Sequence, residues 1–134
     1  MAGRLVVNVD GGSRGNPGPA AIGVVVSRPE GEILDELGET IGDATNNVAE
    51  YRALLRGIER AAEMGASELE LIGDSELVVK QVRGEYRVKD AGLKPLHAQV
   101  KAALAGVRSW SIRNVPREQN AEADRLVNEA LDGG

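Results

Sequence analysis

The stretch Arg4-Leu-Val-Val-Asn-Val-Asp10-Gly-Gly-Ser-Arg-Gly-Asn-Pro-Gly18 determines how the chain is organised. Leu5, Val6, Val7 and Val9 form a mostly apolar, β-branched run, which is typical of a strand in the middle of a sheet. Asp10 ends this run, directly before a glycine-rich loop, where another backbone or a polyanion can approach closely. A carboxylate in this position is costly to desolvate unless it is hydrogen-bonded or paired with a cation. The stretch therefore predicts either an acidic site on a rigid strand or an Asp that opens a tight turn.

The composition limits the class of protein. The 134 residues predict a single domain over residues 1–134 that is large enough to bury a core. Cysteine is absent, so a metal must be held by oxygen atoms or by the single histidine, His97. Phenylalanine is also absent, so the core must consist of Val, Leu, Ile and Ala. We find no apolar run of membrane-spanning length and no secretory leader, so we expect a soluble, cytoplasmic protein.

The charge of the chain is unevenly distributed. The formal net charge is −5, which argues against a nucleic-acid partner. However, residues 80–101 carry six basic and two acidic side chains, a local net charge of +4, whereas residues 1–79 carry −8. This basic segment is either a solvated helix face or a contact surface for nucleic acid.

The predicted elements follow the order β-β-β-α-β-α-α-β-α. Strands over about residues 4–10, 20–27 and 32–41 have short connections, as in an antiparallel meander. A helix capped by Thr45 runs to Gly65, a strand covers residues 69–72, and helices follow over about residues 75–84 and 93–107. A strand over residues 110–113, a loop over 116–120 and a helix to about residue 131 complete the chain. This order predicts an α/β fold with one five-stranded mixed sheet, three strands antiparallel and two parallel, and with helices on both faces.

Four carboxylates are predicted to meet at one edge of this sheet. Asp10 and Asp74 end two strands, while Glu50 and Asp124 each lie about one turn into a helix. A right-handed crossover would make the first and fourth strands parallel neighbours, so that their carboxyl ends share an edge. Four ionised carboxylates repel one another unless cations offset their charge, and oxygen ligands favour Mg²⁺ or Mn²⁺. Two such ions roughly 3.5–4 Å apart promote in-line phosphoryl displacement, so the acids predict phosphodiester chemistry.

Four motifs together resemble type 1 ribonuclease H over essentially the whole chain. They are Asp10-Gly-Gly-Ser-Arg-Gly-Asn-Pro-Gly-Pro19, Thr45-Asn-Asn-Val-Ala-Glu50-Tyr, Gly73-Asp-Ser75 and Asn120-Ala-Glu-Ala-Asp124-Arg. The resemblance implies a ribonuclease H-like fold and a two-metal-ion endoribonuclease that hydrolyses the RNA strand of RNA–DNA hybrids, leaving 5′-phosphate and 3′-hydroxyl ends. It implies that the catalytic and metal-binding residues are Asp10, Glu50, Asp74 and Asp124.

The resemblance also implies cofactors and partners. We expect two Mg²⁺ ions per site with substrate bound, with Mn²⁺ as a substitute. The expected partner is the hybrid, read in its shallow minor groove, and double-stranded RNA is a second candidate. We expect a monomer with no membrane association.

A set of substrate-binding residues follows from the same resemblance. Asn16 and residues 45–47 match positions that contact sugars, bases or a DNA phosphate, although residues 45–47 have helix capping as an alternative role. The full expected set is Gly11, Asn16, Thr45, Asn46, Asn47, Ser75, Arg117 and Asn120.

The chain departs from the family pattern at three places. Arg117 stands where many members have a loop histidine; arginine cannot act as a general base, so its expected role is to hold a phosphate or the product. No tryptophan-containing basic protrusion separates the second and third helices, so we expect weaker, salt-sensitive hybrid binding that relies on the basic segment and the metals. Glu76 replaces an uncharged amide of some relatives, which bears on selectivity. We predict that His97 lies on a helix surface and that Trp110 lies in the core or on the sheet face.

Two other function classes remain as alternatives. A module that binds hybrid or duplex RNA without cutting it is disfavoured, because four unpaired carboxylates would repel a polyanion. An ATP-dependent phosphotransferase with a related fold would need a second domain, and the sequence has no Walker A motif.

Overall fold

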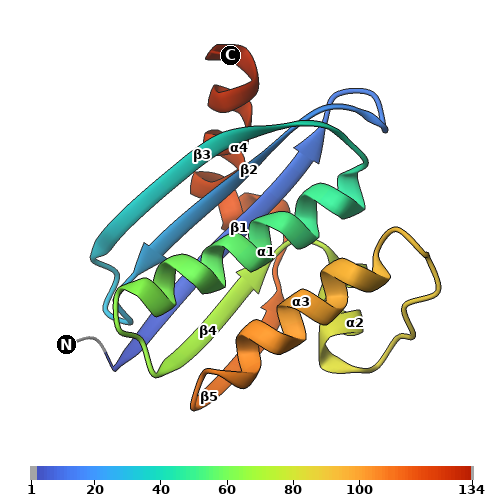
Figure 1. The fold of residues 1–134 in the computed structure, drawn as a ribbon. Helices are drawn as coiled ribbons and strands as arrows, with labels where there is room; N and C mark the ends of the chain where they lie inside the picture. The colour runs from blue at the N-terminus through green and yellow to red at the C-terminus, as the bar shows by residue number, and fades with distance from the viewer. Residues whose placement is uncertain (1–2, 134) are drawn as a thin grey trace.

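The computed structural model describes residues 3–133 and contains the predicted order of elements (Figure 1). The strands and helices are β1 (Arg4–Ser13), β2 (Gly18–Ser27), β3 (Ile33–Ala44), α1 (Asn46–Glu63), β4 (Glu68–Gly73), α2 (Glu76–Arg83), α3 (Lys94–Ala105), β5 (Ser109–Asn114), the 3-10 turn η1 (Arg117–Asn120) and α4 (Ala121–Gly133). None of the helices in this described part is long and apolar enough to cross a membrane.

The five strands form one mixed sheet in the order β3-β2-β1-β4-β5. The β1–β2 and β2–β3 pairs are antiparallel, and the β1–β4 and β4–β5 pairs are parallel, which confirms the predicted sheet. The parallel β1–β4 pairing ends where Asn8 lies opposite Ile72. Asp10 and Asp74 each follow two residues later, so the two carboxylates leave neighbouring strands at the same level.

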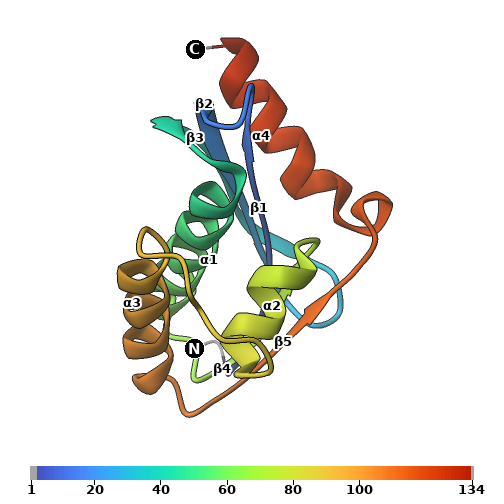
Figure 2. The ribbon, with the colours of Figure 1, turned by 90° about the vertical axis from the view of Figure 1, so that its right-hand side faces the viewer.

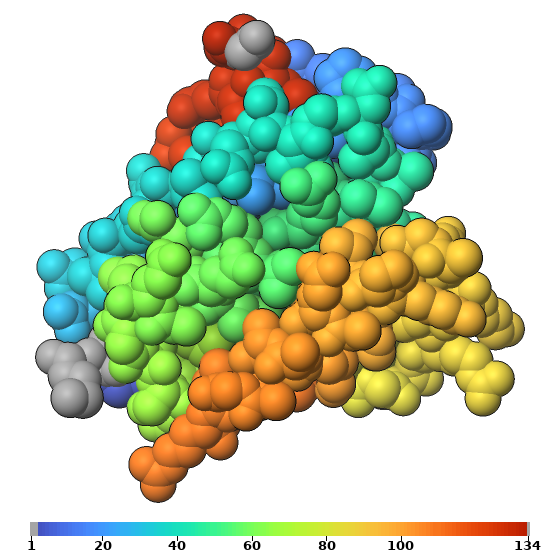
Figure 3. Space-filling view, in the orientation of Figure 1, coloured from blue at the N-terminus to red at the C-terminus, as the bar shows by residue number. Residues whose placement is uncertain are grey.

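Helices cover both faces of the sheet, as predicted (Figure 2). Helices α1, α2 and α3 pack on one face, and Figure 3 shows α1 and α3 side by side over it. Helix α4 lies on the opposite face against β1, β2 and β3. The close approach of α4 to β2 depends on Gly23, where an added Cβ atom would lie 2.3 Å from the carbonyl oxygen of Ala123.

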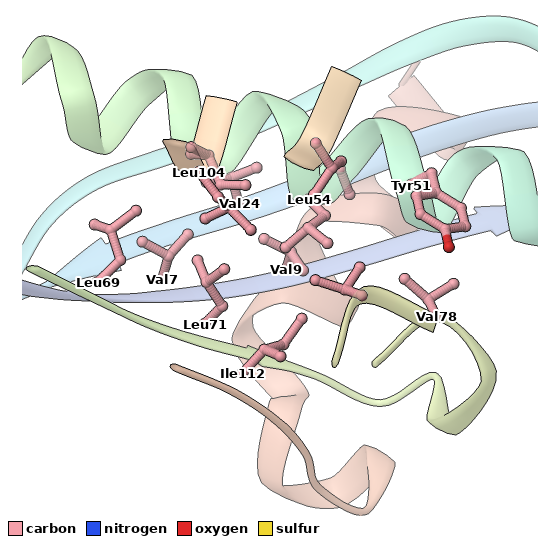
Figure 4. Close-up of a cluster of buried hydrophobic side chains, with 14 of the residues drawn as sticks. Val7, Val9, Val24, Tyr51, Leu54, Leu69, Leu71, Val78, Leu104 and Ile112 are labelled. Atoms are coloured by element: carbon pink, nitrogen blue, oxygen red, sulfur yellow. The ribbon is translucent and has the colours of Figure 1, made fainter. Parts of the chain in front are cut away.

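The main core lies between the sheet and helices α1 to α3 (Figure 4). Side chains such as Val7, Leu71 and Leu54 are fully or almost fully buried in it, and Tyr51 is the one aromatic ring among its fully buried side chains in the described part of the chain. The Tyr51 hydroxyl donates a 2.6 Å hydrogen bond to Oε1 of buried Gln81, which satisfies the polar end of this side chain. The core therefore joins α1 to α2 directly behind the strand ends that carry the acids.

The structure corrects the predicted end of the first strand. Asp10 does not end β1, because residues 10–13 continue the antiparallel pairing with residues 20–23 of β2. The loop is thus confined to residues 14–17, and the carboxylate is held by a strand that extends beyond it.

The structure also corrects the placement of His97. Its side chain is half-buried between α2 and α3, with Nε2 at 3.2 Å from the carbonyl oxygen of Gln81 and the ring edge-on to Tyr51. The short connection over residues 84–93 folds α3 back against α2, which covers a ring that helical spacing placed on the surface.

Candidate active site

Three carboxylates converge at the end of the β1–β4 pair. Asp10 comes from β1, Glu50 from the first turns of α1, and Asp74 from the residue after β4. Each offers one oxygen atom, and these three atoms all lie within 4.8 Å of one another. Asp124, on the first turn of α4, lines the same cleft of about 450 Å³ with Asp10 and Glu50. The structure therefore brings the four acids of the sequence prediction to one place.

The backbone of β1 fixes the position of Glu50. The Gly11 amide donates a 2.9 Å hydrogen bond to Oε1 of Glu50. This contact requires α1 to lie directly on the strand, and a Cβ atom at Gly11 would be only 2.2 Å from the carbonyl carbon of Ala49. Gly11 is thus required by the close approach of two backbones, and its amide orients a carboxylate of the cluster.

Burial raises the pKa values of the clustered acids. Asp10 is 3% exposed and Glu50 is 7% exposed. Loss of solvent, with added repulsion from Asp74 and Asp124, raises the pKa of Asp10 from 3.8 to about 7. Burial also raises the pKa of Glu50 well above its ordinary range, and that of Asp74 is raised in spite of the nearby Arg117 guanidinium. Without a cation, burial and mutual repulsion therefore favour the protonated forms of these acids.

The donor set fits a hard divalent cation. Oδ2 of Asp74 is buried and has no hydrogen-bond partner. An unsatisfied carboxylate oxygen is costly in a protein interior, and this one lies among carboxylates that themselves repel one another. A cation bound by these oxygen atoms would satisfy Asp74 and offset the repulsion, and oxygen-only ligands favour Mg²⁺ or Mn²⁺.

One wall of the cleft is formed by the β1–β2 hairpin, which is hydrogen-bonded to the start of α1. The Asn46 side chain accepts a 2.8 Å hydrogen bond from the Ser13 amide, and the Asn46 amide donates a 2.9 Å bond to the Asn16 side chain. Thr45 caps α1 by accepting from the amide of Val48 at 3.2 Å. Gly11, Asn46 and Asn47 line the cleft, whereas Asn16 and Thr45 support its wall.

The remaining predicted substrate residues have different surroundings. Ser75 lines the cleft and caps α2, since its hydroxyl accepts from the Val78 amide at 3.2 Å. Asn120 is only 2% exposed and does not line this cleft. Its amide group donates to the carbonyl oxygen of Val9 at 2.8 Å and its carbonyl accepts from the Asn8 side chain at 3.1 Å. Asn120 therefore anchors η1 to β1, and we leave it out of the proposed substrate-contacting set.

Arg117 lies at the mouth of the carboxylate cluster. Its side chain is 75% exposed, and Nε lies 3.9 Å from Asp74 and 4.0 Å from Asp124. These separations are ion pairs longer than a hydrogen bond. The guanidinium group therefore partly offsets the acidic charge and stays accessible to another anion.

The basic segment forms a separate surface. Arg87, Lys94 and Lys101 line a groove of about 420 Å³ between α2 and α3. Glu76, which the sequence marked as an unusual acid, is held by Lys80 in a 2.8 Å ion pair.

Sequence reasoning missed part of the cleft wall. Arg14, Val127, Asn128 and Leu131 also line it. The α4 residues could have been found, because positions 124, 127, 128 and 131 share one helical face. The contribution of Arg14 depends on how the hairpin meets α4, which no local pattern indicates.

Comparisons with known proteins agree with this geometry. A family model described as reverse transcriptase-like matches residues 8–130. Ribonuclease HI of Halobacterium salinarum is 49% identical over 130 residues, which cover 97% of this chain and 65% of that relative. The next curated relative, from Mycobacterium bovis, is matched over 36% of its length. The chain thus spans less than two thirds of the curated relatives that it matches first.

Two solved structures have the same fold at high identity. RNase H1 from the halophilic archaeon Halobacterium salinarum NRC-1 superposes with a TM-score of 0.96 at 48% identity, covering 98% of this chain and 100% of that one. LC11-RNase H1, solved in complex with an RNA/DNA hybrid, superposes with a TM-score of 0.92 at 43% identity, covering 96% of this chain and 97% of that one.

Proposed function

The chain belongs to the type 1 ribonuclease H family, and on that premise we propose that it is a metal-dependent endoribonuclease that hydrolyses the RNA strand of RNA–DNA hybrids. The observation that carries the proposal is the convergence of Asp10, Glu50 and Asp74 within 4.8 Å, with Asp124 in the same cleft. The hybrid is the substrate class that we extend to this chain from the LC11 complex. A monomeric state, a cytoplasmic location and double-stranded RNA as a further substrate stay predictions of the sequence.

The four acids are the proposed catalytic and metal-binding residues. They would hold two Mg²⁺ ions when substrate is bound, with Mn²⁺ as a substitute. Bound there, divalent cations would supply Lewis-acid stabilisation of the reacting phosphate and lower the pKa of an attacking water. No side chain of the protein has to act as a covalent nucleophile.

The chain's own residues prepare the cluster for this role. The strands fix Asp10 and Asp74 at one level, and the Gly11 amide orients Glu50. The pKa of Asp10, about 7, means that its carboxyl is partly protonated near neutral pH when no metal is bound. Cation binding must release that proton, so the affinity of the site for Mg²⁺ is expected to rise with pH up to about 8.

Substrate contacts are assigned to the residues around the acids. Gly11, Asn46, Asn47 and Ser75 line the cleft and offer polar groups to a bound strand. Arg117 can pair with a phosphate in two hydrogen bonds, because its present ion pairs are long and its own side chain is exposed. The groove of Arg87, Lys94 and Lys101 offers a second, electrostatic contact with a duplex, so overall affinity should fall steeply with salt.

A substrate panel tests the proposal. The protein would be incubated with labelled RNA–DNA hybrid, duplex RNA and duplex DNA, each with Mg²⁺, Mn²⁺ or chelator. We expect cleavage of the RNA strand of the hybrid, dependent on either metal and abolished by chelation. Glu50→Gln should abolish cleavage, and the matched control Glu30→Gln, an exposed acid in the β2–β3 turn, should not change it.

Other outcomes of the panel point to different functions. Equal cutting of duplex RNA would mean that recognition of the DNA strand is relaxed in this chain. Metal-dependent binding without cutting in either metal would support the non-catalytic module and refute the proposal.

A further inference from the structure

A second positively charged side chain, besides that of Arg117, lines the active-site cleft. Among the described residues that line the cleft, two are positively charged: Arg117 on η1 and Arg14 at the tip of the β1–β2 hairpin. Figure 2 shows that η1 leads into the start of α4, whereas the hairpin tip lies beside the C-terminal half of the same helix. Arg117 Nε lies within 4.0 Å of Asp74 and of Asp124 at the start of α4, whereas the Arg14 guanidinium contacts Asp132 on the last turn of this helix. The two guanidinium groups therefore stand at opposite ends of α4.

The hairpin holds Arg14 on a well-braced loop. The Arg14 amide donates to the carbonyl oxygen of Pro19 at 2.8 Å, and the Ser13 hydroxyl lies 3.3 Å from the carbonyl oxygens of Gly15 and Gly18. The same loop is fixed to α1 through Asn46. The backbone under Arg14 is thus positioned by several hydrogen bonds, while its side chain remains half exposed.

The present partner of Arg14 is a weak competitor. The Arg14 guanidinium contacts Oδ1 of Asp132, on the last turn of α4, at 2.6 Å. The side chain of Arg14 is 50% exposed and that of Asp132 is 67% exposed. Exposed ion pairs contribute only about 0–1 kcal/mol to stability. A phosphate can therefore replace Asp132 at little cost and gain two parallel hydrogen bonds from the guanidinium fork.

We propose that Arg14 is a substrate-positioning residue that binds a backbone phosphate of the bound hybrid at the end of the cleft remote from Arg117, and that Asp132 occupies it when no substrate is present. This inference rests on the proposed function, since it assigns one contact of the same substrate. Among the described residues of α4 that line the cleft beyond Asp124, all three are uncharged, namely Val127, Asn128 and Leu131, so none of them repels a strand that follows this wall.

The length of α4 sets the reach of this contact. Twelve residues of helix, from its start to Asp132, span roughly 18 Å at about 1.5 Å per residue. Each base step advances a duplex by about 3.4 Å. The phosphate held by Arg14 should therefore lie within about five nucleotides of the cleavage position.

Hybrid binding tests the inference without requiring cleavage. Fluorescence anisotropy would measure the affinity of labelled RNA–DNA hybrid in an Asp10→Asn background at several salt concentrations. Arg14→Ala should weaken binding about tenfold or more and reduce the slope of log K against log salt by about 1. Asp132→Asn should strengthen binding, because it removes the competitor. The matched control Arg28→Ala breaks a similar exposed pair with Glu32, outside the cleft-lining residues, and should leave both quantities unchanged.

A neutral phosphate locates the contact. Hybrids with a single methylphosphonate would be scanned across both strands, and Arg14→Ala should lose its effect for one position within the expected five nucleotides. Unchanged affinity and salt slope in Arg14→Ala, or an equal effect of Arg28→Ala, would overturn the inference.

The binding and cleavage results separate the two proposals. If the protein with Asp10 intact cuts the hybrid but Arg14→Ala binds normally, only the Arg14 assignment fails. If it does not cut the hybrid but binding depends on Arg14, only the proposed catalytic function fails.

Discussion

Replacing Asp10 with Asn should make the metal-free protein more stable while removing its proposed activity. The carboxylate of Asp10 is 3% exposed and lies within 4.8 Å of oxygen atoms of Glu50 and Asp74. Burial and these neighbours raise its pKa from 3.8 to about 7. In the unfolded chain the carboxylate is solvated and ionises at its ordinary pKa. The folded protein therefore binds an extra proton between about pH 4 and pH 7.

The direction and size of the effect follow from that proton. Because the folded state binds more protons in this window, the free energy of unfolding falls as the pH rises from about 4 to about 7. A shift of about three pKa units corresponds to about 4 kcal/mol lost at pH 8, at 1.36 kcal/mol per unit. The Asn amide can leave one buried polar group unsatisfied, at a cost of about 1 kcal/mol. We expect Asp10→Asn to gain about 3 kcal/mol at pH 8 and to lose up to about 1 kcal/mol at pH 4, where the folded-state carboxyl is already protonated and only the cost of the amide remains.

Urea unfolding in chelator, followed by circular dichroism at pH 4, 6 and 8, measures this gain. Glu30→Gln serves as a control for loss of an exposed acid. Saturating Mn²⁺ should stabilise the wild type by about 2.7 kcal/mol at one hundred times its dissociation constant, and should stabilise Asp10→Asn much less. A gain that is equal at pH 4 and pH 8, or no gain at either, would refute the electrostatic reasoning.

Three further substitutions separate positioning from packing. Arg117→Ala should lower the rate of hybrid cleavage about ten- to a hundredfold, as expected for loss of a charged hydrogen bond, and Arg117→Lys should restore only part of that rate. Steady-state kinetics would measure both effects, and unchanged kinetics would contradict a phosphate contact. Asn120→Ala should lower the free energy of unfolding, measured by urea unfolding, by about 1–3 kcal/mol, because it leaves the Val9 carbonyl unsatisfied. A raised KM for the hybrid with unchanged stability would instead indicate a substrate role for Asn120. Gly11→Ala should cost at least about 1–3 kcal/mol in the same assay, since its Cβ would lie 2.2 Å from Ala49, and an unchanged urea midpoint would show that α1 can move away.

Much of the fold was predictable because it depends on local patterns. The periodicity of apolar residues, the cap at Thr45 and the stop at Gly65 indicated the helices, and the crossover rule placed β1 beside β4. That pairing alone brings Asp10 and Asp74 together. The positions of Glu50 and Asp124, each about one turn into a helix, added these two acids to the same edge, and the family resemblance assigned all four as metal ligands. The structure places Glu50 and Asp124 at the same cleft.

The differences between the sequence predictions and the structure came from contacts between distant segments. Residues 11–13 include two glycines and did not resemble a strand, yet they pair with β2, and the absence of a Cβ at Gly11 lets α1 lie on the strand backbone. His97 is covered by α2, and Asn120 turns inward toward β1, through packing that helical spacing or a loop motif does not encode. Arg14 enters the cleft only because the hairpin tip meets the last turn of α4, more than one hundred residues later in the chain.

The most direct test of the central claim is the rate of RNA-strand cleavage in an RNA–DNA hybrid by the wild type and by Asp10→Asn, measured in Mg²⁺. The account predicts that Asp10→Asn, although more stable when metal-free, loses about a thousandfold in rate, as expected if several kcal/mol of metal-dependent stabilisation disappear. Lower activity together with higher stability cannot result from misfolding. Cleavage by Asp10→Asn at the wild-type rate would contradict the assignment of a metal-dependent catalytic site to these carboxylates.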